Sequence, residues 1–461
     1  MIDTLVVNVA PGETRLALLD GARLVELRHH RAGRESIVGN LYLGRVTRLL
    51  SGANGAFIDI GQLRPGFLNA GDARPDAHGP VSPIGRYVTE GAAVLVQVSR
   101  DALHGKGPRL TLRPSLVGRT VVFNPGRGGV EVSRRITGKA ERARLARLIG
   151  EARDGGDGVT LRSAAQGAAA DRILGDVADL HDAWGQARRL SERTSPPACL
   201  WTAPEPLAAA VADHPGLRRV VIDDAETLAA ARWLMAGGDA ALERYREDAP
   251  IFESFAVEAA LEEAFEARLG LPSGGALIIE ETHALCAIDV DGGGATGSSS
   301  SLRVNLEAAE AIARQLRLRA IGGVIVIDFL RLGKRDHRRR VIEALAAALA
   351  DDREAVAPEG FSRLGLVEMR RRRRRPSLAE VLGEPGERRK NPATAALDIC
   401  RAAAREAAMA AAGAVALRVA PEVAAAFTPS LLAAVEKAAG RAVELTADAA
   451  YQRQDWRIDL Y

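Results

Sequence analysis

Apolar residues gather in two short runs that each carry an acidic residue at or near the end. Residues 287–291 read AIDVD, and residues 324–329 read VIVIDF. Apolar runs of this length, bounded by glycines, predict buried strands. In open α/β sheets, ligands bind at the carboxyl ends of such strands. If the two strands are neighbours, Asp289 and Asp328 converge, and paired oxygen anions favour a Mg²⁺ site.

The segment between the two runs has the periodicity of a helix. Five apolar residues fall on one helical face at spacings of four and three, namely Leu302, Leu306, Ala309, Ala313 and Leu316. A second helix is predicted from about residue 336 to 349. The order strand, helix, strand, helix predicts a sheet covered by helices. The glycines at 292–294 and the serines at 298–301 predict a flexible loop after the first strand.

The first part of the chain is rich in short strands. Residues 1–34 alternate around a Pro-Gly turn and predict a hairpin. Residues 38–118 predict five short strands with glycine turns, which suit an OB-fold barrel. Phe57 and Phe67 are candidates for stacking on unpaired bases, although two core phenylalanines would give the same pattern. Lys106 lies in a basic turn and is either an RNA contact or a solvated lysine.

Two arginine-containing segments are candidates for binding phosphate. Arg162 and Ser163 follow a predicted strand, and such a pair can hold a phosphate by charge and hydroxyl, although the signal is weak alone. The run of six arginines at 370–375 follows a strand-like segment. It fits phosphate binding and a solvated charged surface equally well.

Composition narrows the class of protein. The 461 residues suffice for about three domains, and 47% hydrophobic with 26% charged residues is typical of a globular protein in water. Neither a long apolar stretch nor a secretory signal is recognised, so we expect no membrane anchoring. The three cysteines lack CxxC spacing, which argues against a zinc ribbon and favours a reducing cytoplasm.

Longer motifs reveal a resemblance to a known family. The stretch from Asn305 through residues 312–319 into residues 326–329 is similar to the ribonuclease E/G family of bacterial endoribonucleases. Further matches are residues 271–275, residues 365–369, and residues 55–57 with 66–68. The similarity covers nearly the whole chain in order.

The resemblance implies an α/β (α+β) multidomain fold. An RNase H-like subdomain would be split by an inserted OB-fold barrel and a 5′-sensor region, and a DNase I-like catalytic subdomain and a small C-terminal α/β domain would follow. The implied boundaries are 1–34 with 215–278 for the RNase H-like subdomain, 35–118 for the OB-fold, 119–214 for the 5′-sensor, 279–400 for the catalytic subdomain and 401–461 for the C-terminal domain.

The resemblance also assigns roles to residues. Asp289 and Asp328 match the catalytic, metal-binding aspartates, which hold Mg²⁺ with Mn²⁺ as a substitute. The residues matched to RNA binding are Phe57, Phe67, Lys106 and Tyr42. The residues matched to binding of the 5′-phosphate are Arg162, Ser163 and Arg363.

Three departures from the family pattern stand out. Residues 383–390 lack the usual cysteine, so we expect no zinc link, and any homo-oligomer would pair without zinc. Asp291 stands where the family usually has Asn, and a further carboxylate could tighten metal binding or disturb it by repulsion. The loop at 292–301 is shorter and less acidic than usual.

The resulting hypothesis is a Mg²⁺-dependent endoribonuclease acting on single-stranded RNA in rRNA or mRNA processing or decay. It would favour 5′-monophosphorylated substrates and leave 5′-phosphate products. The alternative is a catalytically impaired RNA-binding relative. A phosphotransferase or phosphatase with a two-Asp metal site would explain the metal but not the OB-fold.

Overall fold

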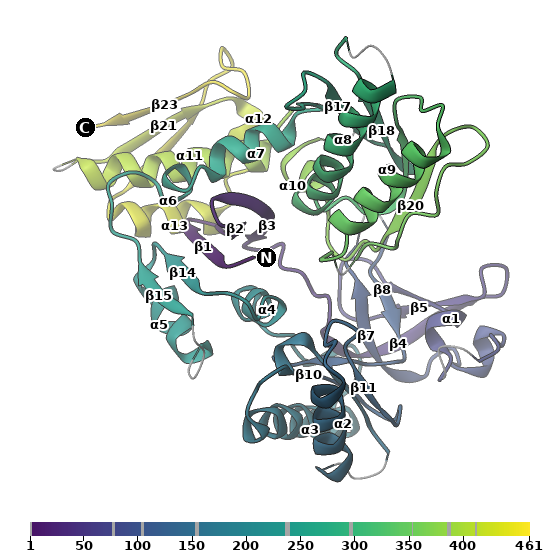
Figure 1. Cartoon of the computed structure of the whole chain (residues 1–461). Coiled ribbons are helices and arrows are strands. Elements are labelled where there is room, and N and C mark those ends of the chain that lie inside the picture. The colour runs from purple at the N-terminus through teal and green to yellow at the C-terminus, as the bar shows by residue number, and fades with distance from the viewer. Residues whose placement is uncertain are drawn as a thin grey trace. The chain divides into compact units, whose positions relative to one another are not determined.

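The computed structural model divides the chain into two compact units. It describes residues 2–75, 79–102, 106–152, 156–235, 240–294, 298–352, 354–384, 389–410 and 413–461. Unit 1 comprises Met1–Glu35 and Leu217–Tyr461, and unit 2 comprises Ser36–Gly216. Most of the elements are labelled in Figure 1. Unit 2 is therefore inserted in the sequence of unit 1.

A closed five-stranded barrel forms the first part of unit 2. Its strands are β4 (Leu41–Leu50), β5 (Gly55–Asp59), β6 (Gly66–Asn69), β7 (Ala93–Arg100) and β8 (Arg109–Thr111). They pair in the order β4-β5-β6-β8-β7, and β7 returns to pair with β4. A short helix α1 (Ala70–Ala73) and a 3₁₀ turn η1 (Ile84–Arg86) connect them. The closure agrees with the predicted OB-type barrel.

The second part of unit 2 combines a small sheet with helices. The sheet is β9 (Leu116–Val117), β10 (Val121–Asn124), β11 (Val130–Val132) and β12 (Gly158–Leu161). The helical elements are α2 (Lys139–Ala152), η2 (Ser163–Ala165), α3 (Ala170–Arg193) and α4 (Pro206–Asp213). Strand β13 (Ala198–Trp201) pairs with barrel strand β4, so the two parts share a sheet.

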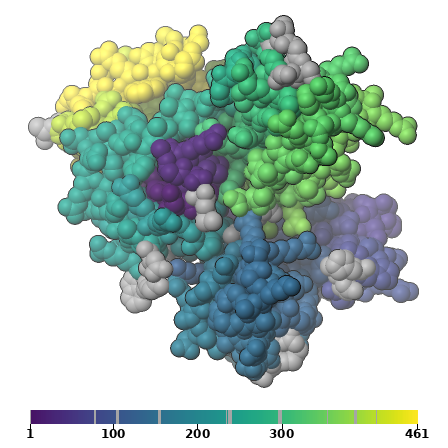
Figure 2. Space-filling view, viewed as in Figure 1, coloured from purple at the N-terminus to yellow at the C-terminus, as the bar shows by residue number. Residues whose placement is uncertain are grey.

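Unit 1 begins with a sheet assembled from distant segments. Its strands are β1 (Thr4–Ala10), β2 (Glu13–Asp20), β3 (Arg23–Arg31), β14 (Arg219–Ile222) and β15 (Ala241–Arg244). The accompanying helices are α5 (Ala225–Leu234), α6 (Ile251–Ser254) and α7 (Val257–Phe265). The predicted hairpin is present as β1 and β2, and β14 pairs parallel to β1. Figure 2 shows the N-terminal residues in purple, bordered on the left by the teal segment that follows residue 217 and on the right by green residues.

A second five-stranded sheet of unit 1 carries the predicted metal-binding aspartates. Its order is β16 (Arg268–Gly270), β17 (Ala276–Glu281), β18 (Leu285–Asp291), β19 (Gly323–Asp328) and β20 (Val367–Arg371). Within this sheet, β18 and β19 pair in parallel, and the described pairings of the other neighbouring strands are antiparallel. The helices are α8 (Ser298–Leu318), α9 (Arg335–Ala348) and α10 (Leu378–Leu382). The predicted order strand, helix, strand, helix is confirmed by β18, α8, β19 and α9.

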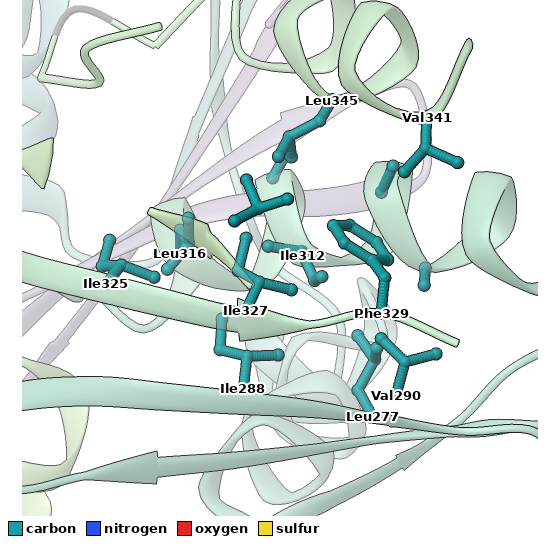
Figure 3. Packing of buried hydrophobic residues seen from close by; sticks show 14 of the residues in the cluster. Leu277, Ile288, Val290, Ile312, Leu316, Ile325, Ile327, Phe329, Val341 and Leu345 are labelled. Carbon is teal, nitrogen blue, oxygen red and sulfur yellow. The ribbon is translucent and has the colours of Figure 1, made fainter. Parts of the chain in front are cut away.

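One face of this sheet is covered by α8 and α9. Ile288, Ile325 and Ile327 from the strands pack against Ile312 of α8 and Leu345 of α9 (Figure 3). The cluster is continuous and includes side chains from every strand of the sheet, with Leu269 as the contribution of β16. Burial of this apolar layer fixes which side of each strand faces inward, since neighbouring residues of a strand point to opposite faces.

The loop predicted after β18 is shorter than the sequence suggests. Residues 298–301 belong to the start of α8 rather than to a loop. Serine is favoured at helix N-termini because its hydroxyl can accept hydrogen bonds from unpaired backbone N–H groups, so a serine run at a boundary is compatible with either structure. Residues 295–297 lie outside the described residues.

The C-terminal part of unit 1 is a small three-stranded sheet packed against helices. It contains α11 (Pro392–Met409), β21 (Val415–Val419), α12 (Pro421–Ala424), α13 (Pro429–Ala439), β22 (Val443–Ala447) and β23 (Trp456–Leu460). Helix α11 runs through residue 400, where a boundary was expected, and its buried side chains pack with β21. Across the described ranges, every helix is too short or too polar to span a bilayer.

The alternation along β19 gives a direct test of the packing. Ile325 is fully buried, whereas the adjacent Val324 is 43% exposed on the opposite face. Ile325→Ala should lower the free energy of unfolding by about 3 kcal/mol because it leaves a cavity between sheet and helices. Val324→Ala should cost less than about 1 kcal/mol. Equal shifts of the denaturation midpoint in the two variants would contradict the observed orientation of β19.

Candidate active site

Asp289 and Asp328 lie side by side on neighbouring strands. In the parallel pairing of β18 with β19, Asp289 is the register partner of Asp328. Their sequence neighbours Ile288 and Ile327 are buried in the core, so both carboxylates project from the opposite, open face of the sheet. Adjacent strands are about 4.8 Å apart, which brings the two carboxylates within reach of one ion.

The chemistry of this pair fits a hard divalent cation. Both aspartates are exposed, and within the described residues neither carboxylate has a hydrogen-bond or ion-pair partner. Among the described residues, no group of three or more His, Cys, Asp or Glu side chains is arranged to hold a metal, so these two aspartates form a pair of carboxylates and not a larger ligand cluster. Two free carboxylates suit Mg²⁺, which is usually bound through one or two carboxylates and keeps several water ligands.

Asp291 is engaged differently from the other two carboxylates. Arg268 Nη2 donates to Asp291 Oδ2 at 2.8 Å, and the Gly293 N–H donates to Asp291 Oδ1 at 3.0 Å. The Gly293 hydrogen bond and the Arg268 guanidinium lower the pKa of Asp291. Its negative charge is thus balanced by Arg268, which reduces the repulsion that an additional carboxylate would exert on Asp289.

A buried amide anchors the chain just after Asp328. Asn305 on α8 is fully buried; its Nδ2 donates to Leu330 O at 2.8 Å, and Leu330 N donates to its Oδ1 at 3.0 Å. The amide therefore satisfies both backbone groups of Leu330. Because a buried unsatisfied pair is costly, this contact fixes the exit of β19 against α8.

Arg363 lies at the tip of a tight turn leading into β20. Ser362 N donates to Leu366 O at 2.7 Å, and Gly365 N donates to Ser362 O at 3.0 Å. Phe361 anchors the turn, because the centroid of its ring lies 6.1 Å from the ring centroid of Phe329. Phe329 directly follows Asp328 in the sequence. The turn therefore presents an exposed Arg363 near the end of β19, within unit 1.

Phe57 and Phe67 form a pair on the outer surface of the barrel. They are direct cross-strand partners on β5 and β6, with ring centroids 5.7 Å apart in an edge-to-face arrangement. Ala56, Ile58 and Leu68 fill the barrel core instead. Both phenylalanines remain partly exposed, so the reading of two core residues is wrong, and their placement leaves ring surface available for stacking.

An arginine lies on each side of the aromatic pair, at the same level across neighbouring strands. Arg48 is the register partner of Phe57, and Arg109 is the register partner of Phe67. The Arg109 guanidinium lies over the Phe67 ring, 5.9 Å from its centroid. Lys106 is exposed just before β8. A surface with aromatic rings between cations is typical of binding to single-stranded nucleic acid.

Tyr42 occupies a different place from the other residues matched to RNA binding. It is only 5% exposed and belongs to the apolar cluster inside the barrel. Burial raises the pKa of its hydroxyl. Stacking of a base on this ring would first require the barrel to uncover it.

Arg162 is held at the end of β12 by two contacts. Its Nη1 donates to Gly118 O at 2.5 Å, and its Nη2 forms an ion pair with Asp213 Oδ1 at 2.6 Å. The side chain is 10% exposed. The Ser163 hydroxyl has no hydrogen-bond partner among the described residues. A phosphate at this site would therefore share the guanidinium with Asp213 or displace it.

Comparison with known proteins places the chain in a family. A model described as "Ribonuclease E/G family" matches residues 115–374. The chain is 39% identical over 405 residues to ribonuclease G of Escherichia coli (strain K12), covering 83% of this chain and 82% of that protein. The chain belongs to the ribonuclease E/G family.

Two further members of the family extend the comparison. Ribonuclease G of Haemophilus influenzae is 36% identical over 397 residues, covering 82% of this chain and 81% of that protein. Ribonuclease E of Nostoc sp. is 35% identical over 362 residues, covering 75% of this chain and 53% of that protein. The similarity therefore extends to members named for either type of ribonuclease.

Two residues of unit 2 that position matched side chains of this ribonuclease E/G family member were not predicted from the sequence. Asp213 is distant in sequence from Arg162, and no motif links them. Gly55 was noted only as part of a match, yet a Cβ there would lie 2.5 Å from Phe67 Cζ. An unusual glycine facing a matched aromatic on the adjacent strand could have suggested this close approach.

Replacement of Gly55 tests whether the barrel surface depends on this close approach. Gly55→Ala should push the Phe67 ring aside, because 2.5 Å is too short for a carbon–carbon contact. We expect a stability loss of about 1–3 kcal/mol and weaker RNA binding. Gly52→Ala is the matched control, since nothing lies within 4 Å of a Cβ at that position. Unchanged RNA affinity in Gly55→Ala would show that RNA binding does not depend on the orientation of the Phe67 ring.

Proposed function

We propose that this protein is a Mg²⁺-dependent endoribonuclease that cleaves single-stranded RNA. The observation that carries the proposal is the pair Asp289 and Asp328, which are in register, exposed and without partners among the described residues. The names of the related proteins support a ribonuclease. The outward aromatic pair on the barrel supports a single-stranded substrate.

Each group of residues has a separate task in its own unit. Asp289 and Asp328 bind the ion, and Asn305 keeps the end of β19 in position against α8. When bound, Mg²⁺ supplies an activated water and a counter-charge for the scissile phosphate. Phe57 and Phe67 hold unstacked bases through their ring surfaces. Hydrolysis of the P–O3′ bond leaves a 5′-phosphate on one product and a 3′-hydroxyl on the other.

Substitution of the aspartates should separate cleavage from binding. Asp289→Asn and Asp328→Asn should each lower kcat by at least about a thousandfold, because a neutral amide holds Mg²⁺ poorly. RNA affinity in the absence of metal should stay within about twofold, because the barrel surface is unchanged. Cleavage is measured on a 5′-labelled A/U-rich single strand with Mg²⁺ or with EDTA.

Asp291→Asn is the matched control for this experiment. It removes a carboxylate from the same face of β18, but one that is already paired with Arg268. We expect most of the activity to remain. Full cleavage by both Asp289→Asn and Asp328→Asn would rule out the proposal, and RNA binding without any cleavage by the unaltered chain would favour the impaired relative.

We further propose that Arg162 and Ser163 favour a 5′-monophosphorylated end. The unpaired Ser163 hydroxyl and the guanidinium fixed by Gly118 offer a donor pair for a terminal phosphate. The neighbouring Asp213 would disfavour the greater negative charge of a triphosphate.

Cleavage of RNAs that differ only at the 5′ end tests this preference. Ser163→Ala should reduce the advantage of the monophosphate over the hydroxyl by about three- to tenfold in kcat/KM, because one hydrogen bond is lost. Cleavage of the 5′-hydroxyl RNA should be unchanged in this variant. Arg162→Gln should reduce the advantage further, with a loss of stability from the broken Asp213 pair. An unaltered preference in both variants would refute this role.

A further inference from the structure

Four of the six consecutive arginines at 370–375 are bound within the fold. Arg371 is buried, with its Nε donating to Asp352 Oδ2 at 2.7 Å and its Nη1 to Ile321 O at 2.7 Å. Arg373 donates to Gly322 O at 3.0 Å and to Glu380 Oε1 at 3.1 Å. These contacts tie β20 to the segment that leads into β19.

The next two arginines are also paired. Arg374 lies 2.8 Å from Glu354, and Arg375 Nη1 lies 2.9 Å from Glu26 Oε1 on β3. By contrast, neither Arg370 nor Arg372 has an ion pair or side-chain hydrogen bond within the described residues. The run therefore combines four arginines that stabilise the fold with two that are available for other contacts.

Arg370 faces the same side of the sheet as the two aspartates. Along β20, Val367, Met369 and Arg371 are buried, so the intervening Arg370 points to the open face. Arg370 is the register partner of Val324 on β19. Asp328 lies four residues farther along β19, which is a distance of about 13 Å at 3.3 Å per residue.

Two exposed apolar side chains flank Arg370 on this face. Val324 is 43% exposed on one side, and Val356 is 53% exposed on the other, where its N–H donates to Arg370 O at 2.9 Å. Glu368 also faces outward, but no ion pair joins it to Arg370 in the described part of the chain. The row Val356, Arg370, Val324 thus offers a free cation between two apolar surfaces.

We propose that Arg370 binds a backbone phosphate of the RNA strand a few nucleotides from the scissile position, with Val324 and Val356 contacting the adjacent ribose or base. This inference rests on the proposed function. The 13 Å separation corresponds to roughly two to four nucleotides, depending on whether the strand is stretched or stacked at about 3.4 Å per phosphate. A guanidinium suits this task because it binds phosphate oxygens in bidentate fashion and is always charged.

The contact would also fix the path of the strand across the metal-binding pair. Asp289 and Asp328 would hold an ion that attracts one phosphate, and Arg370 would hold a second one farther along β19 and β20. Two fixed phosphates on one face define a line, so the scissile bond is placed by the spacing between them. The four paired arginines hold β20 and the residues after it in the position that this spacing requires.

The test compares Arg370→Gln with Arg340→Gln. Arg340 is an exposed arginine on α9, the helix that covers the opposite face of the same sheet. Binding of a single-stranded RNA is measured without divalent metal over a range of salt concentrations. Arg370→Gln should weaken binding about fivefold and make the slope of log K against log salt shallower by about 0.7, the value for one phosphate contact on a single strand. Arg340→Gln should change neither quantity.

Substrate length locates the contact. KM is measured for RNAs shortened one nucleotide at a time on either side of the cleavage site. In the unaltered chain, KM should rise about fivefold when the phosphate opposite Arg370 is removed from one side, whereas Arg370→Gln should show no such step. The double variant Val324→Ser/Val356→Ser should weaken binding without changing the salt slope, since no charge is lost.

The outcomes separate this inference from the proposed function. If the unaltered chain cleaves RNA, and Arg370→Gln keeps the same salt slope and the same step in KM, the Arg370 contact is wrong and the nuclease proposal stands. Equal losses in Arg370→Gln and Arg340→Gln indicate general charge attraction and also overturn the contact. If the unaltered chain binds but does not cleave, the nuclease proposal fails, and the salt slopes alone decide whether Arg370 holds a phosphate.

Discussion

The parallel, in-register pairing of β18 with β19 is the constraint on which the site depends. A shift of one residue between these strands would turn either Asp289 or Asp328 into the core. The burial of Ile288 on one strand and of Ile325 and Ile327 on the other prevents that shift, because it would expose large apolar side chains. The position of the two carboxylates is thus determined by the apolar packing on the far side of the same sheet.

Charge pairing distinguishes structural from available groups in this chain. Asp291 is balanced by Arg268, and Arg371 is balanced by Asp352. Asp289 and Asp328, in contrast, have no partner among the described residues and share one open face with the equally unpaired Arg370. Two carboxylates suited to a cation and a guanidinium suited to an anion on one face are consistent with a metal and a phosphate chain bound together.

The main elements of the sheet that carries Asp289 and Asp328 are predictable from the sequence, but several of its contacts are not. Apolar runs bounded by glycines predicted β18 and β19, and the 3.6-residue period predicted α8, since both patterns directly reflect burial. The serine run was misread because serine suits both loops and helix N-termini. The sequence could not show which arginines of the run at 370–375 are paired, because the partners Asp352 and Glu26 come from elsewhere in the chain.

The barrel illustrates the same limit. The short strands and glycine turns predict a closed barrel, and the pairing of β4 with β7 closes it. Whether an aromatic faces inward depends on its place in the alternation, which the glycine-rich segments obscure. Phe57 and Phe67 face outward, whereas Tyr42 is buried. Family resemblance could match these three residues but did not distinguish their environments.

Direct binding of a metal ion tests the central claim most simply. Mn²⁺ in place of Mg²⁺ can be titrated into the RNA-free protein, and bound Mn²⁺ is counted by electron paramagnetic resonance. The account predicts one site in the unaltered chain, at least about tenfold weaker in Asp289→Asn and in Asp328→Asn, and retained in Asp291→Asn. Undiminished Mn²⁺ binding in both Asp289→Asn and Asp328→Asn would show that this pair of carboxylates does not form the metal site.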